Sequence, residues 1–164
     1  MVLLLALIPL FSCEKNSDRE PEYPEDSFYF TSFESSADTA GWYGIGTENL
    51  VEDAPRVGGE YSAEISGGCI APHAYYRFGP LAEDLSLMLR CWGKNLSNGG
   101  SVSLHLEDYS GHIGISVSEP DWTRYECEDT LSCKAGSTVI LELNSGGILS
   151  SAMRVDQLEI SELK

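Results

Sequence analysis

RVDQLEI, residues 154–160, alternates polar and apolar side chains with a period of two, which is typical of a β-strand. Leu158 and Ile160 would then point into a core. Asp156 has the same parity, so we expect its carboxylate to face inward as well. Burying an unpaired carboxylate is costly, so this position raises the question of what Asp156 binds.

Strand-like segments recur through the rest of the chain, separated by clusters of Gly, Pro, Asn, Asp and Ser. The predicted strands are 28–34, 60–66, 73–78, 85–94, 101–108, 113–118, 122–127, 137–144 and 152–161. No amphipathic helix is predicted, and the run PLAEDLSLML, residues 80–89, favours a turn that leads into a strand. Many short strands in one domain predict an all-β fold, a β-sandwich or jelly roll over residues 28–164.

Composition places the chain among globular proteins and excludes one class of partner. The chain has 164 residues, of which 42% are apolar, and a formal net charge of −16. A polyanion gains nothing by approaching a phosphate backbone, so we expect no nucleic-acid binding. The simplest role of the charge is to keep the protein soluble.

The N-terminal run MVLLLALIPLFSC, residues 1–13, is too short to span a bilayer and has the length of the apolar region of a signal peptide. Its ending resembles a bacterial lipobox, with Leu10, Ser12 and the lipidated Cys13. Phe11 is bulkier than usual there, and no Lys or Arg precedes the run. A plain signal peptide and a buried strand are the alternatives.

We therefore expect a lipoprotein signal peptide at 1–12 and an acidic, flexible tether at 13–27. The lipid anchor would hold the domain at the cell envelope, on the outer-membrane, periplasmic or cell-surface side.

Four further cysteines, Cys69, Cys91, Cys127 and Cys133, allow three disulfide pairings in an exported protein. The short loop between Cys127 and Cys133 favours that bridge, with Cys69–Cys91 as its complement. The alternative is that some are reduced and buried, and Cys91 shares the parity of the apolar residues in its strand. No CxxC pair is present, so zinc is not expected.

Six motifs in order resemble the galactose-binding-like jelly roll of bacterial carbohydrate-binding modules, as found in Bacteroidetes lipoproteins. They are FTSFESSADTAGW (30–42), GGEYSAEIS (58–66), LSLMLRCWGKN (85–95), DWTRYE (121–126), STVILELNSGG (137–147) and RVDQLEI. The resemblance covers nearly all of 28–164 and implies the fold more strongly than the function.

The resemblance implies a structural calcium ion at the edge of the sandwich, which would answer the question raised by Asp156. The matching positions are Glu34, the Gly58-Gly59-Glu60 turn and Asp156. Calcium prefers six to eight oxygen ligands, so carboxylates and carbonyls together suit it. The alternative is that Asp156 caps backbone N–H groups of a neighbouring turn.

Sugar sites combine aromatic platforms with a few polar groups. Side chains of outward parity with this composition are expected to share one sheet face: Arg90, Trp92, His105, Glu107, Tyr109 and Glu142. Tyr75 and Tyr76 are candidates near the loops. Alternatively, Arg90 pairs with Glu107 or Glu142, and a loop covers Trp92. Trp42 and Trp122 are expected to be structural.

We expect no enzymatic activity, because the motifs of serine hydrolases, zinc proteases and phosphate-binding loops are absent. Only Glu107 with Glu142 remains as a carboxylate pair for glycoside hydrolysis. The first hypothesis is non-catalytic binding of a polysaccharide or oligosaccharide by a membrane-anchored lipoprotein, with partner proteins of a glycan-utilisation system. The second is a structural or protein-interaction domain without a sugar site.

Overall fold

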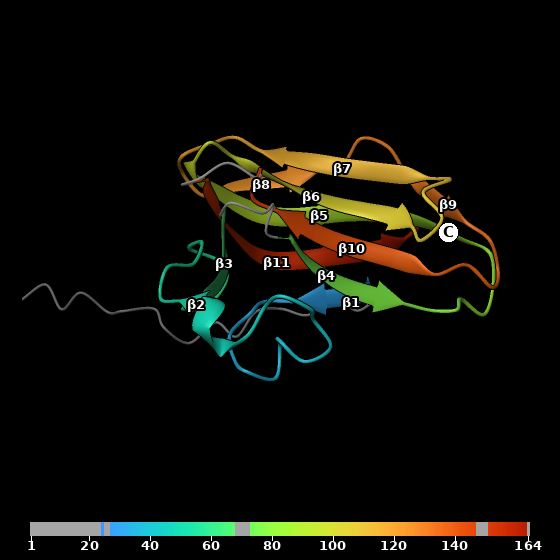
Figure 1. Cartoon of the computed structure of the whole chain (residues 1–164), viewed down its shortest axis with the longest axis horizontal. Coiled ribbons are helices and arrows are strands. Elements are labelled where there is room, and N and C mark those ends of the chain that lie inside the picture. The colour runs from blue at the N-terminus through green and yellow to red at the C-terminus, as the bar shows by residue number, and fades with distance from the viewer. Residues whose placement is uncertain (1–23, 25–26, 68–72, 147–150, 164) are drawn as a thin grey trace, which may run out of the picture.

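The computed structural model describes residues 24, 27–67, 73–146 and 151–163, and these form two antiparallel β-sheets packed face to face (Figure 1). The larger sheet contains β1 (Ser27–Thr31), β2 (Leu50–Val51), β3 (Ser62–Ser66), β5 (Leu85–Ser97), β8 (Thr123–Glu126), β9 (Leu131–Cys133) and β11 (Ala152–Glu162). The smaller sheet has the order β4 (His73–Phe78), β10 (Val139–Asn144), β6 (Gly100–Leu106) and β7 (His112–Val117). In Figure 1 the strands of the smaller sheet run across the view in this order, from β4 at the bottom to β7 at the top. The described part is therefore the all-β sandwich that the sequence predicted.

Two long strands organise the larger sheet. β11 pairs with β5 along one edge, while its other edge pairs first with β3 and then with β1. β5 likewise pairs on its far edge with β9 and then with β8. Short strands placed end to end thus complete a sheet built on two long neighbours.

Alternation of side chains places the core between the sheets. In β5 and β10 every second residue is buried, and Leu87, Leu89, Leu141 and Leu143 are fully enclosed. Two sheets that are each apolar on one face bury those faces from water by packing them against each other, which is why this pattern produces a sandwich.

A β-bulge interrupts β11 where β3 ends and β1 begins. The pairing of β11 with β5 shifts between Asp156 and Glu159, and Gln157 has a φ of 43°. An extra residue in one strand changes the parity, so both Val155 and Asp156 are buried side by side. The expectation that Asp156, Leu158 and Ile160 face inward is confirmed, since each is 0% exposed.

All nine predicted strands exist, with ends displaced by a few residues. Three further elements, β2, β9 and the short 3-10 helix η1 (Thr47–Asn49), were not predicted because they are too brief to carry a periodic pattern. No α-helix occurs in the described ranges, as expected. Within them, no helix is long and apolar enough to span a bilayer. Residues 1–13, with Cys13, lie outside the described residues.

The predicted Cys127–Cys133 disulfide is wrong, because both residues are buried free thiols. The N–H of Cys127 donates to the carbonyl of Leu89, whereas Cys133 pairs with Leu85. Four residues along a strand correspond to about 13 Å, roughly twice the Cα separation of a disulfide. A loop that is short in sequence therefore holds its two cysteines apart along β5.

Cys91 is a buried thiol on the inner face of β5, in agreement with its parity. Burial raises the pKa of this thiol to about 12, so it stays protonated and packs as a small apolar side chain. Cys69, its expected partner, lies outside the described residues.

Candidate functional site

The single polar face predicted from parity is wrong, because its residues are divided between two sheets on opposite sides of the sandwich. Arg90 and Trp92 lie on β5 of the larger sheet, whereas His105 and Glu142 lie on β6 and β10 of the smaller one. Parity tells which side chains point away from the core, but both sheets have an outer face. β5 and β6 follow each other in sequence yet belong to different sheets, so sequence order misleads here.

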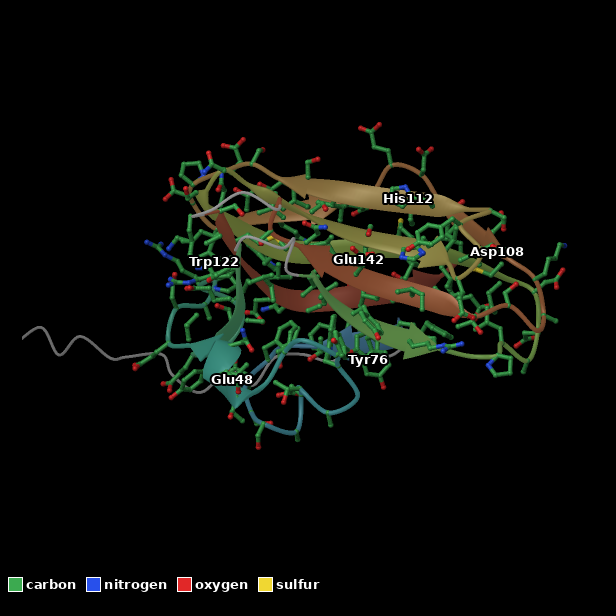
Figure 2. All side chains as sticks on the ribbon, in the orientation of Figure 1. Glu48, Tyr76, Asp108, His112, Trp122 and Glu142 are labelled. Atoms are coloured by element: carbon green, nitrogen blue, oxygen red, sulfur yellow. The ribbon has the colours of Figure 1, made fainter. Side chains whose placement is uncertain are left out.

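The outer face of the smaller sheet gathers most of the predicted residues around a hollow of about 240 Å³. Its lining consists of Tyr75, Arg77, His105, Glu107, Tyr109, Ile140 and Glu142. We call this surface the smaller-sheet face. Glu142 is labelled over the middle of this sheet in Figure 2, with Asp108 at the end of the strands. Five residues expected in a sugar site, namely Tyr75, His105, Glu107, Tyr109 and Glu142, are thus brought together.

At the centre of the smaller-sheet face, Tyr109 covers His105. The two rings stack with centroids 4.5 Å apart and an interplanar angle of 12°. Although His105 points away from the core, this cover leaves it only 3% exposed, while Tyr109 is 74% exposed. The outer face of the tyrosine ring is therefore a flat apolar platform, rigidly backed by the imidazole.

Both ring nitrogens of His105 face acceptors. Nδ1 lies 3.0 Å from the carbonyl oxygen of Leu106, and Nε2 lies 3.3 Å from Oε2 of Glu142. In either neutral tautomer the ring has one N–H, which donates to one of these two acceptors. The pair fixes the orientation of the platform from below.

Tyr109 reaches this position through a turn rather than a strand. β6 ends at Leu106, and the backbone N–H of Tyr109 donates to the carbonyl of Leu106 at 2.8 Å. Tyr109 has a φ of 57°, and Asp108 accepts hydrogen bonds from the N–H and hydroxyl of Ser110. The predicted strand extended to residue 108, but β6 ends at Leu106, so the turn and not strand alternation places Tyr109 on this face.

A second aromatic platform flanks the hollow. Tyr75 stacks on Tyr43 with centroids 4.8 Å apart and an angle of 25°. Tyr43 is 61% exposed and lies in a loop, so no strand pattern marked it as a site residue. Beside this pair, Arg77 forms an ion pair of 2.7 Å with Glu107. Glu107 thus faces a cation, whereas Glu142 faces the imidazole of His105.

Tyr76 does not belong to this face. It pairs with Leu141 in the register of β4 and β10, and its ring packs against Tyr29, Trp42 and Phe78. Neighbouring residues in a strand point to opposite sides, so Tyr75 and Tyr76 cannot share one surface. Tyr76 therefore belongs to the aromatic packing at the sandwich edge.

Beyond Glu107 the surface is hollowed again, over about 480 Å³, between residues 106–108 and 135–138. The lining is mostly short side chains and backbone of two turns. Nothing in the sequence pattern indicated this extension, because it depends on how the two turns sit against each other.

On the larger sheet, Arg90 and Trp92 have different neighbours from those expected. The Arg90 guanidinium pairs with Glu126 at 3.0 Å and with Glu159 at 3.4 Å, rather than with Glu107 or Glu142. Trp92 is partly exposed and lines a groove of about 400 Å³ on the outer face. The predicted cover of Trp92 by a loop is therefore incomplete.

The other two tryptophans are structural, as expected. Trp42 is buried, and its Nε1 donates to the Tyr29 hydroxyl at 3.0 Å. Trp122 donates to Oδ1 of Asp53 at 3.1 Å. Lys94 lies 2.8 Å from the other oxygen of Asp53, which Arg154 also contacts, and these partners lower the pKa of the Asp53 carboxyl to about 2 despite its partial burial.

The predicted calcium residues are partly brought together. Gly58 lies against Asp156, since a Cβ there would be 2.6 Å from Oδ2, and Gly59 lies against the Glu34 carboxyl. Glu34 accepts the backbone N–H of Glu60 at 2.9 Å, and the Glu60 side chain is exposed. The N–H of Glu60 thus ties this turn to Glu34, while its side chain points to solvent. Among the described residues, no three His, Cys, Asp or Glu side chains gather as metal ligands.

Asp156 is capped on one oxygen only. Oδ1 accepts the backbone N–H of Gln157, the next residue of β11, at 2.7 Å and not an N–H of a neighbouring turn, and Oδ2 is buried without a hydrogen-bond partner among the described residues. Burial, with the nearby Glu34 and Asp38 charges, raises the pKa of Asp156 to about 8. Burial also raises the pKa of Glu34. An unpartnered buried oxygen beside a second carboxylate suits a cation such as Ca²⁺.

Comparison with known proteins identifies the fold. The sequence matches no protein-family model, and no curated protein matches it. The structure is similar to the CBM22-1 xylan-binding domain of Xyn10C from Paenibacillus barcinonensis, with a TM-score of 0.60 and 12% identity over 85% of this chain and 96% of that one.

Two further structures give the same result. The CBM22-1–GH10 modules of xylanase 10B from Clostridium thermocellum, complexed with xylohexaose, match with a TM-score of 0.59 and 13% identity over 86% of this chain, which spans 29% of that one. A CBM36-1 domain of a xylanase from the hindgut metagenome of Trinervitermes trinervoides matches with a TM-score of 0.51 and 14% identity over 83% and 98% of the chains. The chain therefore has the jelly-roll sandwich fold of carbohydrate-binding modules.

Proposed function

We propose that the protein binds a glycan without catalysis, and that the smaller-sheet face is the binding surface. The observation that carries this proposal is the Tyr109–His105 stack, an exposed flat ring held over a hollow lined by polar side chains. Pyranose rings present C–H faces to aromatic rings and hydroxyl groups to polar side chains. Tyr109 and Tyr75 supply the first kind of contact, and Glu142, Glu107 and Arg77 the second.

Charge on this face favours a neutral glycan. Arg77 pairs with Glu107, and His105 contacts Glu142. Of the described residues that line the hollow, Arg77 is the only Lys or Arg, and its guanidinium already has its counter-charge. The groups in these pairs can still donate hydrogen bonds to sugar hydroxyls and accept hydrogen bonds from them. An acidic ligand would have to displace the carboxylate that already pairs with the cation. This displacement costs desolvation free energy and supplies no additional opposite charge.

The structural neighbours support this proposal. One is described as a xylan-binding domain and another was solved with xylohexaose. These properties belong to those proteins, and for the present chain they make neutral β-linked oligosaccharides the first ligands to test.

Replacing Tyr109 by alanine should weaken binding of neutral oligosaccharides about tenfold or more, because the stacking platform is lost. The wild-type domain is first screened on an array of neutral oligosaccharides that includes xylohexaose, and the best ligand is then titrated by calorimetry. Tyr61→Ala serves as the control, since Tyr61 is also an exposed tyrosine but lies outside this face.

Equal binding by Tyr109→Ala and wild type would remove the smaller-sheet face from the proposal. No binding to any glycan on the array would favour the structural or protein-interaction domain instead.

We also propose that the domain is held at the cell envelope by a lipid on Cys13, with residues 1–12 as signal peptide and 13–27 as tether. The lipobox-like ending of the N-terminal apolar run supports this. A glycan-binding domain on such a tether would retain polysaccharide near the cell, where partner proteins of glycan utilisation would act on it.

A structural Ca²⁺ held by Asp156 and Glu34 completes the proposal, with oxygens of the adjoining backbone filling the remaining positions. Its support is the buried, unpartnered Oδ2 of Asp156. The ion would neutralise the two carboxylates and join β11 to the Gly58–Gly59 turn, which is a contribution to stability and not to sugar recognition.

Adding Ca²⁺ to chelator-treated protein should raise its melting temperature by several degrees, since a ligand at a hundredfold excess over its Kd stabilises by about 2.7 kcal/mol. Differential scanning calorimetry with and without chelator measures this shift, and Asp156→Asn should abolish it. An unchanged melting temperature of the wild type would leave Asp156 as a turn cap.

A further inference from the structure

We propose that the groove on the outer face of the larger sheet is a second binding site, selective for a sugar residue that carries a carboxylate, such as a uronic acid. This groove, which we call the Trp92 groove, has a volume of about 400 Å³ and is lined among others by Phe30, Arg90, Trp92, Arg124, Gln157 and Glu159. It is independent of the smaller-sheet face, because the two surfaces lie on opposite sides of the sandwich.

The floor of the groove is built from three adjacent strands. Trp92 lies on β5 between Asp156 of β11 and Arg124 of β8 in the strand register. The bulge in β11 at this level turns Gln157 outward, where its Nε2 donates to the carbonyl of Val57 at 2.8 Å. The loop at Val57 is thereby fixed as one wall, and the partly exposed indole of Trp92 remains accessible beside it.

The two arginines of the groove differ in their partners. Arg90 is held by Glu126 and Glu159, so its charge is already balanced. Arg124 is exposed, and its side chain makes no hydrogen bond and no ion pair with the described residues, although its charge helps to lower the pKa of Glu126. Arg124 lies opposite Trp92 on the neighbouring strand, and its guanidinium retains its full set of five N–H donors. The nearby Glu126 carboxylate is directed to Arg90.

This pairing of groups selects an acidic sugar. An indole ring contacts the C–H face of a pyranose, and a guanidinium binds a carboxylate through two parallel hydrogen bonds. A carboxylate-bearing pyranose uses both groups at once. A neutral sugar would use only the indole, and an inorganic anion only the guanidinium. The volume lies within the range of small-molecule sites.

The test uses trigalacturonate and a triglucuronate as probes, each compared with its methyl ester, which keeps the sugar and removes the charge. Calorimetric titration, with tryptophan fluorescence as a second readout, should show that the wild type binds at least one acid about tenfold or more tighter than its ester. Arg124→Gln should abolish this preference, and Trp92→Phe should weaken binding of the acid.

Lys134→Gln is the matched control, because it removes one exposed positive charge that is paired with Asp84 outside both surfaces. It should leave the preference unchanged. Melting temperatures of all variants establish that they are folded.

Three results would overturn the proposal. They are no binding of either acid, equal preference in Arg124→Gln and wild type, or displacement of the acid by an equal concentration of inorganic phosphate, which would indicate a general anion site. None of these bears on neutral-glycan binding through Tyr109, so the two proposals fail separately.

Discussion

Wild-type protein in chelator should lose stability as the pH rises from 4 to 8, and Asp156→Asn should remove most of this loss. The pKa of Asp156 is raised from 3.8 to about 8 in the folded state, so between these values the folded protein binds more protons than the unfolded chain. Stability from this group is therefore fully present below pH 4 and declines up to pH 8. The expected loss is on the order of 5 kcal/mol, at 1.36 kcal/mol for each pKa unit.

Denaturant unfolding at intervals of one pH unit measures the slope for both proteins. Asp53 does not disturb this window, because its pKa is lowered to about 2 and its contribution is lost only below pH 4. The raised pKa of Glu34 acts in the same direction as that of Asp156 and remains in the variant. Identical slopes for the two proteins would show that the Asp156 carboxylate is ionised in the folded state without calcium.

Replacing Phe33 by alanine should lower the free energy of unfolding by about 3–5 kcal/mol, the usual cost of deleting a buried aromatic ring. Phe33 is 0% exposed, and its ring lies 5.8 Å from that of Trp42 at an angle of 52°. Its φ of 55° starts the turn that carries Glu34 toward Gly59. A positive φ is as unfavourable for alanine as for phenylalanine, so the loss in the free energy of unfolding reflects the missing ring and not a change in backbone strain.

Urea denaturation of Phe33→Ala gives this value directly. Leu163→Ala is the control, since Leu163 is 44% exposed and should change stability by less than about 0.5 kcal/mol. A loss below 1 kcal/mol for Phe33→Ala would mean that the aromatic cluster at this edge closes the cavity by repacking.

Alternation along the chain was enough to predict the strands and their inner faces. Alternation assigns each residue of a strand to one of two faces, and the apolar face is the one that carries Leu87 and Leu89 in β5 and Leu141 and Leu143 in β10. The bulge in β11 was not predicted, since it depends on β3 and β1 meeting end to end along one edge.

The candidate site was half predictable for a related reason. His105, Glu107, Tyr109 and Glu142 lie together as expected, and Tyr75, which was expected near the loops, lies beside them. Arg90 and Trp92 were joined to this group because parity cannot distinguish two outer faces. Tyr43 was missed because its stacking on Tyr75 is a contact between a loop and a strand, and no periodic pattern records such contacts. The assignment of strands to sheets is long-range information.

The place of β11 also determines when this protein can fold. The last strand of the domain, β11, lies in the middle of the larger sheet, where Phe30 near the start of the domain pairs with Glu159 near its end. The native pairing of β1, β3 and β5 with β11 cannot form before β11 is present. The entropy cost of closing a loop over nearly the whole domain is therefore met before most stabilising contacts form, so we expect folding to be slow. Until β11 is in place, β3 and β5 keep open edges that can pair with other chains.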